Sequence, residues 1–304
     1  MDFCPEIENT RFTRWAKSLS ATGLQLMLSA YLGCKGITLS IYDLEGVILQ
    51  EDPQWAELLN QMRPVYDALC EYDLWDWSSE GVGLITAPDR IAECGKQVSL
   101  IQELARGRQW DGILTKAGIP CKYITPDQID NSNGVALDGY TAGLLREEEI
   151  RIILSKGVLL DAGAAEVLCQ KGFSKEIGVT VGPKVECIAN CEILDTYTRG
   201  DGSPVRISAR INGYKWNQLE LKGASQISTL LTPDGNRYAG MTYYENDLGG
   251  KVYVYASNGS VGDGFYTNYR MQFIKEICQN ITGNSLVEID NGSYALTASK
   301  AKGN

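Results

Sequence analysis

The chain contains no histidine among its 304 residues. This absence excludes Ser-His-Asp hydrolysis, Cys-His catalysis, including amide transfer by a Cys-His pair, and the usual histidine-ligated zinc hydrolases. Positive charge is also scarce, because 28 Lys and Arg residues stand against 38 Asp and Glu residues, and the basic residues are scattered. We therefore expect neither nucleic acid nor a membrane surface as a partner. The function classes that remain are catalysis by carboxylate, lysine or tyrosine side chains, catalysis by a bound cofactor, and binding without catalysis.

Long apolar runs are absent too, since none approaches the ~20 residues that a membrane span requires. The first residues, MDFCPEIENTRF, show neither the basic nor the apolar part of a secretory signal. The nine cysteines are spread out without a C-x-x-C pair, and most of them lie in apolar patterns typical of small buried residues. Reducing cytoplasm is the expected compartment. No motif calls for a cofactor or a metal, so we expect none.

The first of three compositional regions, residues 1–77, has few elements. We expect a helix over 22–33, capped by Thr22 and ended by Gly33, a strand over 36–43, and a helix from Pro53 to residue 72. The inward face of the first helix is predicted to consist of Leu24, Met27, Leu28 and Tyr31. These elements are too few for a closed β/α barrel, which needs eight strands.

The second region, residues 78–182, alternates strands with helices. Strands are expected over 81–86, 121–125 and 157–160, with helices between and after them. Such alternation predicts a doubly wound parallel sheet. The stretch GVLLDAGAAEVLCQKGF, residues 157–173, predicts a buried strand that turns directly into a helix. Asp161 is expected to cap that helix, and Gly172 to end it.

The third region, residues 183–304, is rich in β-branched and aromatic residues in alternating runs, separated by turn signals such as TPDGN and LGG. One amphipathic helix is expected over 268–283. The region therefore reads as a mostly antiparallel β domain with one helix, and the three regions are expected to pack firmly because no linker separates them.

Two pairs of carboxylates are candidates for chemistry. Glu6 and Glu8 lie in PEIEN, and Asp43 and Glu45 follow a buried strand in IYDLEG. Paired carboxylates are what hydrolysis of a glycosidic bond requires. The alternative, equally weighted, is that these are solvated surface side chains.

Two tryptophans, Trp75 and Trp77, lie close together in DLWDWSSEG. Aromatic rings of this kind stack on sugars, but they also seal contacts between regions of a chain. The seal between the first two regions is the favoured interpretation.

The sequence resembles family 42-type β-galactosidases in three stretches, in the same order. Residues 11–46 resemble the last part of the catalytic barrel, residues 156–173 the glutamine-amidotransferase-like second domain, and residues 235–256 the β-rich tail. The resemblance implies a barrel remnant, a flavodoxin-like domain and an antiparallel β domain. In the amidotransferase fold, the sharp turn between this strand and the following helix carries a nucleophilic Cys. This chain has Gly163 at that turn, so residues 157–173 are expected to be structural scaffold and not a catalytic site.

The resemblance also implies the C-terminal portion of a retaining glycoside hydrolase. Glu6 or Glu8 then matches the nucleophile position, with Glu6 favoured, while the acid/base has no counterpart. The chain would be a fragment, act in an assembly, or be inert. A carbohydrate substrate and a homo-oligomer, associated through the amidotransferase-like domain, are the implied partners.

Asp43, Glu45, Trp75 and Trp77 would contact the carbohydrate substrate. Two alternatives stay open. One is a non-catalytic carbohydrate-binding or oligomerisation module. The other is a nucleotide-dependent enzyme, which is supported only by glycine-rich turns that lack the G-x-G-x-x-G spacing.

Overall fold

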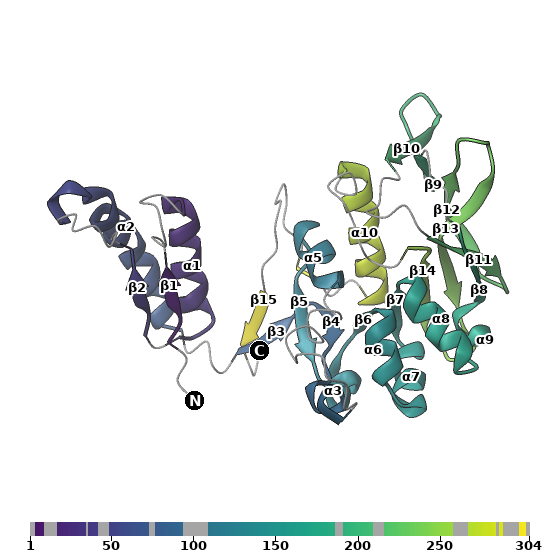
Figure 1. The fold of residues 1–304 in the computed structure, drawn as a ribbon, viewed down its shortest axis with the longest axis horizontal. Coiled ribbons are helices and arrows are strands. Elements are labelled where there is room, and N and C mark those ends of the chain that lie inside the picture. Colours follow the sequence, from purple (N-terminus) through teal and green to yellow (C-terminus); the bar gives the residue numbers. More distant parts are fainter. Residues whose placement is uncertain are drawn as a thin grey trace. The chain divides into compact units, whose positions relative to one another are not determined.

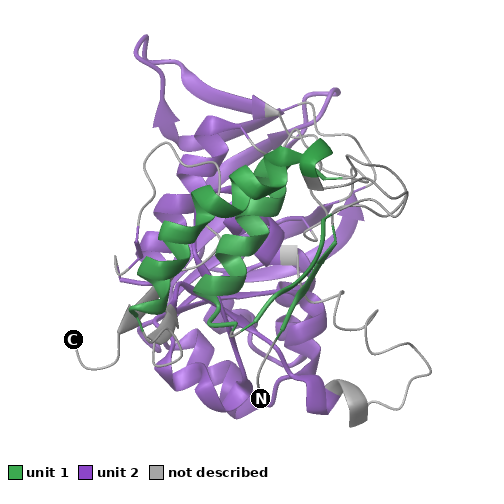
Figure 2. Ribbon diagram, turned by 90° about the vertical axis from the view of Figure 1, so that its left-hand side faces the viewer, with its two compact units in different colours: residues 1–78, 299–304 green, residues 79–298 purple. Residues whose placement is uncertain are grey.

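A computed structural model describes residues 4–8, 17–34, 36–41, 49–72, 77–93, 109–185, 191–208, 216–257, 267–283, 286–287 and 298–301. Its contacts divide the chain into two compact units, residues 1–78 with 299–304, and residues 79–298 (Figure 2). Helices and strands are mixed, and the strands include a large mixed sheet. The α/β class predicted from the sequence is therefore confirmed at this level.

Within residues 4–72, the described part of the first unit contains two parallel strands and two helices (Figure 1). Its elements are β1 (Glu6–Glu8), α1 (Leu19–Tyr31), β2 (Thr38–Ser40), the 3-10 turn η1 (Leu49–Glu51) and α2 (Pro53–Cys70). Strand β1 pairs in parallel with β2. Helix α2 begins at Pro53, as predicted, because proline at the first helical position lacks only an amide that would be unpaired anyway.

The start and the buried face of α1 differ from the prediction. The helix is capped by Ser18, whose hydroxyl accepts a hydrogen bond from the Ala21 amide at 3.1 Å, and Thr22 is buried within it. Leu24 and Met27 are 42% and 38% exposed. The buried face is instead Thr22, Gly23, Leu26 and Ser29. Small residues let α2 come close: a Cβ at Gly23 would lie 3.3 Å from Leu58. The buried face of α1 is therefore determined by the close approach of α2, and not by a stripe of apolar side chains.

The second unit is built on a nine-stranded sheet with the order β10-β9-β12-β13-β14-β7-β6-β4-β5. Its parallel strands are β4 (Val82–Ile85), β5 (Cys121–Ile124), β6 (Gly134–Leu137), β7 (Gly157–Leu160) and β14 (Lys251–Tyr255). The antiparallel strands are β9 (Cys191–Thr198), β10 (Pro204–Ser208), β12 (Ser225–Leu231) and β13 (Arg237–Glu245).

Strand β14 joins the two parts of this sheet, because it pairs antiparallel with β13 and parallel with β7. The described antiparallel strands thus extend the parallel ones within one sheet. Residues 252–255 are buried on both faces, as in a strand covered from both sides. The predicted boundary at 182/183 falls within β8 (Val179–Val185), and the three-part division of the chain stays a prediction.

The remaining described strands form two small two-stranded sheets. Strand β8 pairs with β11 (Trp216–Leu221), and β3 (Trp77–Glu80) pairs with β15 (Ala298–Ala301). The turns predicted at TPDGN and LGG are confirmed, since Gly235 and Gly249 have φ angles of 86° and 83°.

Helices cover both faces of the large sheet (Figure 1). Val158 and Leu160 belong to one core, and Leu159 between them belongs to the other, as expected from alternation along a strand. The first core lies under α6 (Gly139–Leu144), α7 (Glu147–Leu154), α8 (Ala162–Gln170) and α9 (Ser174–Ile177). The second lies under α5 (Gln109–Lys116) and α10 (Asn268–Ile281). Helix α3 (Pro88–Glu93) and the 3-10 turn η3 (Pro126–Asn131) lie in the connections around β5.

The strand and helix predicted over 157–173 are confirmed as β7 and α8. The helix predicted over 268–283 is confirmed as α10. Among the described helices, none combines the length and apolar character that a bilayer crossing would need.

Glycine at position 157 is required by the packing of α10 on β7. A Cβ there would lie 2.1 Å from the Ile281 carbonyl oxygen and 2.5 Å from its Cα, and backbone atoms cannot rotate away. We expect Gly157→Ala to lower the free energy of unfolding by about 1–3 kcal/mol, as overpacking does. Equilibrium urea unfolding measures it.

Gly112→Ala is the matched control, because Gly112 lies inside α5 and nothing lies within 4 Å of its Cβ position. Helix propensity predicts a gain of up to about 1 kcal/mol for this variant. Equal effects of the two substitutions would contradict the close contact between α10 and β7.

Candidate functional site

The two carboxylates of β1 lie on one face of the strand. Ile7 is buried, while Glu6 is exposed and Glu8 is half-buried. Side chains alternate along a strand, so Glu6 and Glu8 share the face opposite to Ile7, with Cα atoms roughly 6–7 Å apart. This face therefore carries the paired carboxylates that the sequence singles out.

Glu8 and Glu6 differ in their position along β1. Glu8 is the last residue of the strand and is paired in register with Ser40, the last residue of β2, whereas Glu6 is the first and is paired with Thr38. Carboxyl ends of parallel strands meet at the same edge, so Glu8 is the one directed to the edge from which the loop after β2 departs.

The remaining predicted site residues are mostly outside the described residues. Asp43, Glu45 and Trp75 are not described, although Asp43 follows the end of β2 by three positions in the sequence. Trp77 begins β3, and its side chain is not described either. The structure thus brings Glu6 and Glu8 together and leaves the other four assignments as predictions.

A second pair of carboxylates, not singled out from the sequence as a pair, lies at the carboxyl ends of β6 and β7. Asp138 accepts hydrogen bonds from the amide and the hydroxyl of Thr141, at 2.9 Å and 3.0 Å. Asp161 accepts one from the Ala164 amide at 2.6 Å. Each aspartate therefore caps the helix that follows its strand, and the predicted cap at Asp161 is confirmed.

The two helix starts meet glycine to glycine. A Cβ at Gly139 would lie 2.7 Å from the carbonyl carbon of Gly163 and 2.8 Å from its Cα. Any larger residue at Gly139 would push the two turns apart. The turn after β7 thus carries a packing contact at Gly163.

Burial controls the protonation of both aspartates. Burial raises the pKa of Asp161 to about 7, against the opposing hydrogen bond from Ala164, and the negative charge of Asp138 raises it further. Burial also raises the pKa of Asp138, while hydrogen bonds from Thr141 lower it. Near neutral pH a proton on Asp161 therefore relieves the repulsion between two buried carboxylates.

This shift predicts a pH-dependent stability. The pKa of Asp161 is raised in the folded state, so its protonated form is favoured there. Stability is greatest below the unfolded pKa near ~4 and is lost as the pH rises towards ~7. Asn keeps the capping oxygen but does not titrate. We expect wild type to lose about 2 kcal/mol more than Asp161→Asn between pH 5 and pH 8, in urea unfolding at both pH values.

Asp201→Asn is the control for this comparison. Asp201 is exposed, and hydrogen bonds from Ser203 lower its pKa, so its titration lies outside the pH range used. A pH dependence that Asp161→Asn leaves unchanged would show that Asp161 is ionised in the folded state throughout.

Sequence reasoning missed a buried ion pair between β9 and α10. Arg270 and Glu192 are 1% and 0% exposed, with 2.6 Å between Nη1 and Oε2. The other Glu192 oxygen and the Ser228 hydroxyl have no hydrogen-bond partner among the described residues. A signal was present, because Arg270, Phe273, Ile274 and Ile277 recur at the spacing of one helical face. An arginine within an apolar face implies a buried acidic partner.

No three His, Cys, Asp or Glu side chains gather as a metal site would require, in the part of the chain that the structure describes. The expectation that no cofactor is needed remains a prediction.

Comparison with known proteins gives a likeness in structure without one in sequence. No protein-family model and no curated protein sequence matches the chain. Among solved structures, Gan42B, a GH42 β-galactosidase from G. stearothermophilus, aligns over 90% of this chain at 10% identity, with a TM-score of 0.56. A β-galactosidase from Bacillus circulans sp. alkalophilus aligns over 92%, at 12% identity and a TM-score of 0.58.

An α-L-fucosidase, isoenzyme 2 from Paenibacillus thiaminolyticus, aligns over 92% of the chain at 11% identity, with a TM-score of 0.59. The chain spans less than half the length of these structures: 43% of Gan42B and 44% of each of the other two. The predicted resemblance to family 42-type β-galactosidases is thereby confirmed for the fold.

Proposed function

We propose that this chain is the C-terminal portion of a retaining glycoside hydrolase acting on glycosides. One observation carries the proposal: the likeness of fold to two β-galactosidases and an α-L-fucosidase, which extends over about nine tenths of the chain. The whole enzyme would then be about twice as long as this chain, and the missing acid/base would belong to the rest of it.

The domain assignment proposed with this function has three parts. Residues 1–77 are the end of a β/α barrel, which β1, α1 and β2 support as one unit with parallel strands. Residues 78–182 are an amidotransferase-like domain without a catalytic Cys-His pair. Its strands, with β14, lie in the order β5-β4-β6-β7-β14, which is the flavodoxin-like order 2-1-3-4-5. Residues 183–304 are the β-rich part with one helix.

Glu8 is the nucleophile in this proposal, in preference to Glu6. Its position at the carboxyl end of β1 supports the choice, because barrel enzymes carry their chemistry at the carboxyl ends of strands. The Glu8 carboxylate would attack the anomeric carbon and form a glycosyl ester, while the aglycone leaves with a proton from the acid/base. Water would then hydrolyse the ester with net retention.

Substrate contacts are proposed for the four residues not described, or described only in their backbone. Asp43 and Glu45 follow β2, and would lie on the same edge as Glu8. Trp75 and Trp77 would supply aromatic faces for the sugar ring.

The test compares this chain with a longer protein that joins it to the remaining barrel. Nitrophenyl β-galactosides and α-L-fucosides are the substrates, and NMR identifies the anomer formed first. We expect turnover with retention from the longer protein and none from the chain alone, because general acid help alone contributes ~10²–10⁴-fold.

Two outcomes would count against the proposal. Turnover by the chain alone would mean that a second carboxylate within it acts, with Asp43 and Glu45 as the first to examine. A longer protein that is folded but inert towards all these glycosides would contradict the assignment as a glycoside hydrolase.

A non-catalytic module for oligomerisation is the second candidate. Leu24, Met27 and Leu32 on and after α1 are 42%, 38% and 63% exposed, which favours a covered surface in an assembly. Light scattering over a tenfold dilution series tests the homo-oligomer, with Leu24→Asp and Met27→Asp expected to shift the equilibrium towards monomer.

A further inference from the structure

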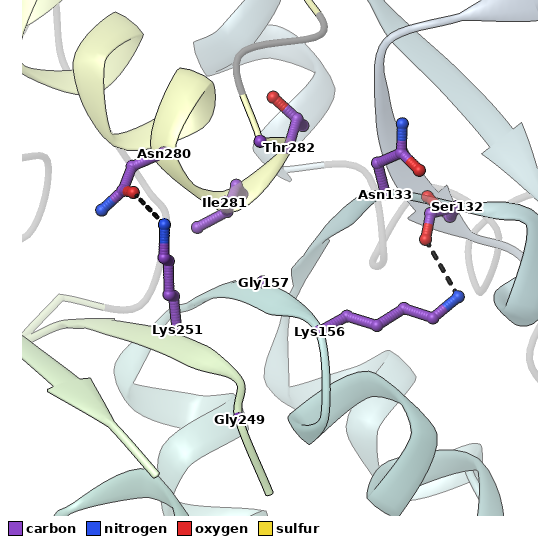
Figure 3. A pocket seen from close by; sticks show the side chains of 10 residues that line it. Ser132, Asn133, Lys156, Gly157, Gly249, Lys251, Asn280, Ile281 and Thr282 are labelled. Atoms are coloured by element: carbon purple, nitrogen blue, oxygen red, sulfur yellow. Dashed lines mark hydrogen bonds between the residues drawn. The ribbon is translucent and has the colours of Figure 1, made fainter.

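A cavity of about 370 Å³ lies at the amino ends of β7 and β14, beside the end of α10 (Figure 3). It is therefore at the opposite edge of the parallel strands from Asp138 and Asp161. Its volume lies at the lower end of the range of small-molecule sites. The lining residues are Ser132, Asn133, Lys156, Gly157, Gly249, Lys251, Asn280, Ile281, Thr282 and Gly283.

The charge of this lining is positive. Two lysines are among the ten residues, and no carboxylate is. This contrasts with the whole chain, whose net charge is −10. Glu245, the cross-strand neighbour of Lys251, is not part of the lining, and its carboxylate accepts a hydrogen bond from the Tyr243 hydroxyl at 3.4 Å.

The two ammonium groups differ in their free donors. Lys156 donates to the carbonyl oxygens of Ile129, Asp130 and Ser132, at 3.0, 2.5 and 3.1 Å. Its three protons are thereby used, although its charge remains. Lys251 donates once, to Asn280 Oδ1 at 2.7 Å, and the described residues offer its ammonium no other partner. Two of its N–H groups are thus available for a ligand.

Asn280 holds Lys251 in this position. The Asn280 amide nitrogen donates to the Tyr253 hydroxyl, which fixes the amide oxygen towards Lys251. In Figure 3 the Lys251 and Lys156 side chains extend in different directions, towards Asn280 and Ser132, with Gly157 between them. Gly157 between them is buried, because the backbone of Ile281 lies against it.

We propose that this cavity binds a small molecule through an oxyanion, a phosphate or a carboxylate, which accepts hydrogen bonds from Lys251. The charge of Lys156 adds attraction without a direct contact. The end of α10 carries partial negative charge and does not favour an anion, so Lys251 must supply the contact. The site is independent of the proposed glycosidase activity, since it uses none of the same residues.

The probes are inorganic phosphate, acetate and the neutral sugar galactose, titrated into the whole chain at constant ionic strength. Calorimetry gives the affinity, and amide chemical shifts of Gly157, Gly249 and Gly283 locate the ligand. We expect phosphate or acetate to bind and to shift these amides, and galactose not to. The comparison of the two anions distinguishes a phosphate from a carboxylate ligand.

Three variants give the proposal its test. Lys251→Met is expected to weaken anion binding by about tenfold or more, the effect of losing a charge-assisted hydrogen bond. Lys251→Arg keeps the charge and is expected to bind within a few fold of wild type. Lys222→Met is the control, because Lys222 is 53% exposed and pairs with Glu220 outside the cavity.

Several results would overturn the proposal. These are no anion binding by wild type, anion binding that Lys251→Met leaves unchanged, or galactose binding of equal strength in all variants. Thermal unfolding confirms that each variant is folded, and Lys251→Gln, which also removes the charge, takes the place of Lys251→Met if that variant does not fold.

Discussion

Replacing Glu8 by Ala in the longer enzyme is expected to reduce kcat/KM for an aryl galactoside about a thousandfold or more, about 4 kcal/mol of transition-state stabilisation. The nucleophile forms the new bond to the anomeric carbon in the first step, so no neighbouring group replaces it. Glu6→Ala is the matched control, since Glu6 lies two residues away on the same face but at the amino end of β1. We expect less than about a tenfold loss for Glu6→Ala, because Glu6 would not touch the reacting atoms.

Rescue by azide separates a nucleophile from a structural residue. In Glu8→Ala the space of the carboxylate is open to a small anion, which attacks the anomeric carbon and gives a glycosyl azide of inverted configuration. We expect azide to restore turnover of a dinitrophenyl glycoside, whose leaving group needs no acid. Rescue of Glu6→Ala alone would assign the role to Glu6, the residue that the sequence favours.

Local signals explain what the sequence predicts well. Strand β7 and helix α8 are confirmed because an apolar run, a capping aspartate and Gly172 follow one another within 17 residues. The same kind of signal was overlooked at β6 and α6. GVALDGYTA, residues 134–142, and GVLLDAGAA, residues 157–165, share a strand that ends at a capping aspartate. The capping role of Asp138 was therefore predictable from the sequence, because its surroundings repeat those of Asp161.

Helix α1 shows where local signals compete. Ser18 and Thr22 are both good capping residues, and Leu24 and Met27 are both apolar, so the sequence alone does not choose. The choice comes from α2, which packs against Gly23 and whose Tyr66 hydroxyl donates to the Leu26 carbonyl at 2.7 Å. Contacts between residues 35 and 40 positions apart thus set the buried face.

The joining role of β14 has the same origin. Its sequence, KVYVY, suits an antiparallel strand and a buried parallel strand equally well. Its parallel pairing with β7 connects residues about 94 positions apart, for which the sequence has no local marker. The paired carboxylates of β1 were predictable as a pair, but their order along the strand followed only from the register with β2.

Removal of one partner of the buried ion pair is expected to give the largest loss of stability in the second unit. Arg270→Met leaves the Glu192 carboxylate 0% exposed and without its cation, at a cost of about 3–5 kcal/mol in the free energy of unfolding. The cost arises because the Glu192 carboxylate, on β9, is closed off from water, and a Cβ at Gly240 of β13 would be only 3.2 Å from its Oε1. Urea unfolding of Arg270→Met against wild type measures it.

The double variant Glu192→Met with Arg270→Met distinguishes a lost attraction from a stranded charge. Without either charge the site is apolar, and buried ion pairs replaced by apolar residues are often neutral or stabilising. We therefore expect the double variant to be more stable than Arg270→Met. Lys175→Met breaks an exposed pair with Asp247, whose side chains are 77% and 76% exposed, and should change nothing measurable. If the double variant is instead the less stable one, the guanidinium and carboxylate act mainly through packing, and the stranded charge is not what destabilises the single variant.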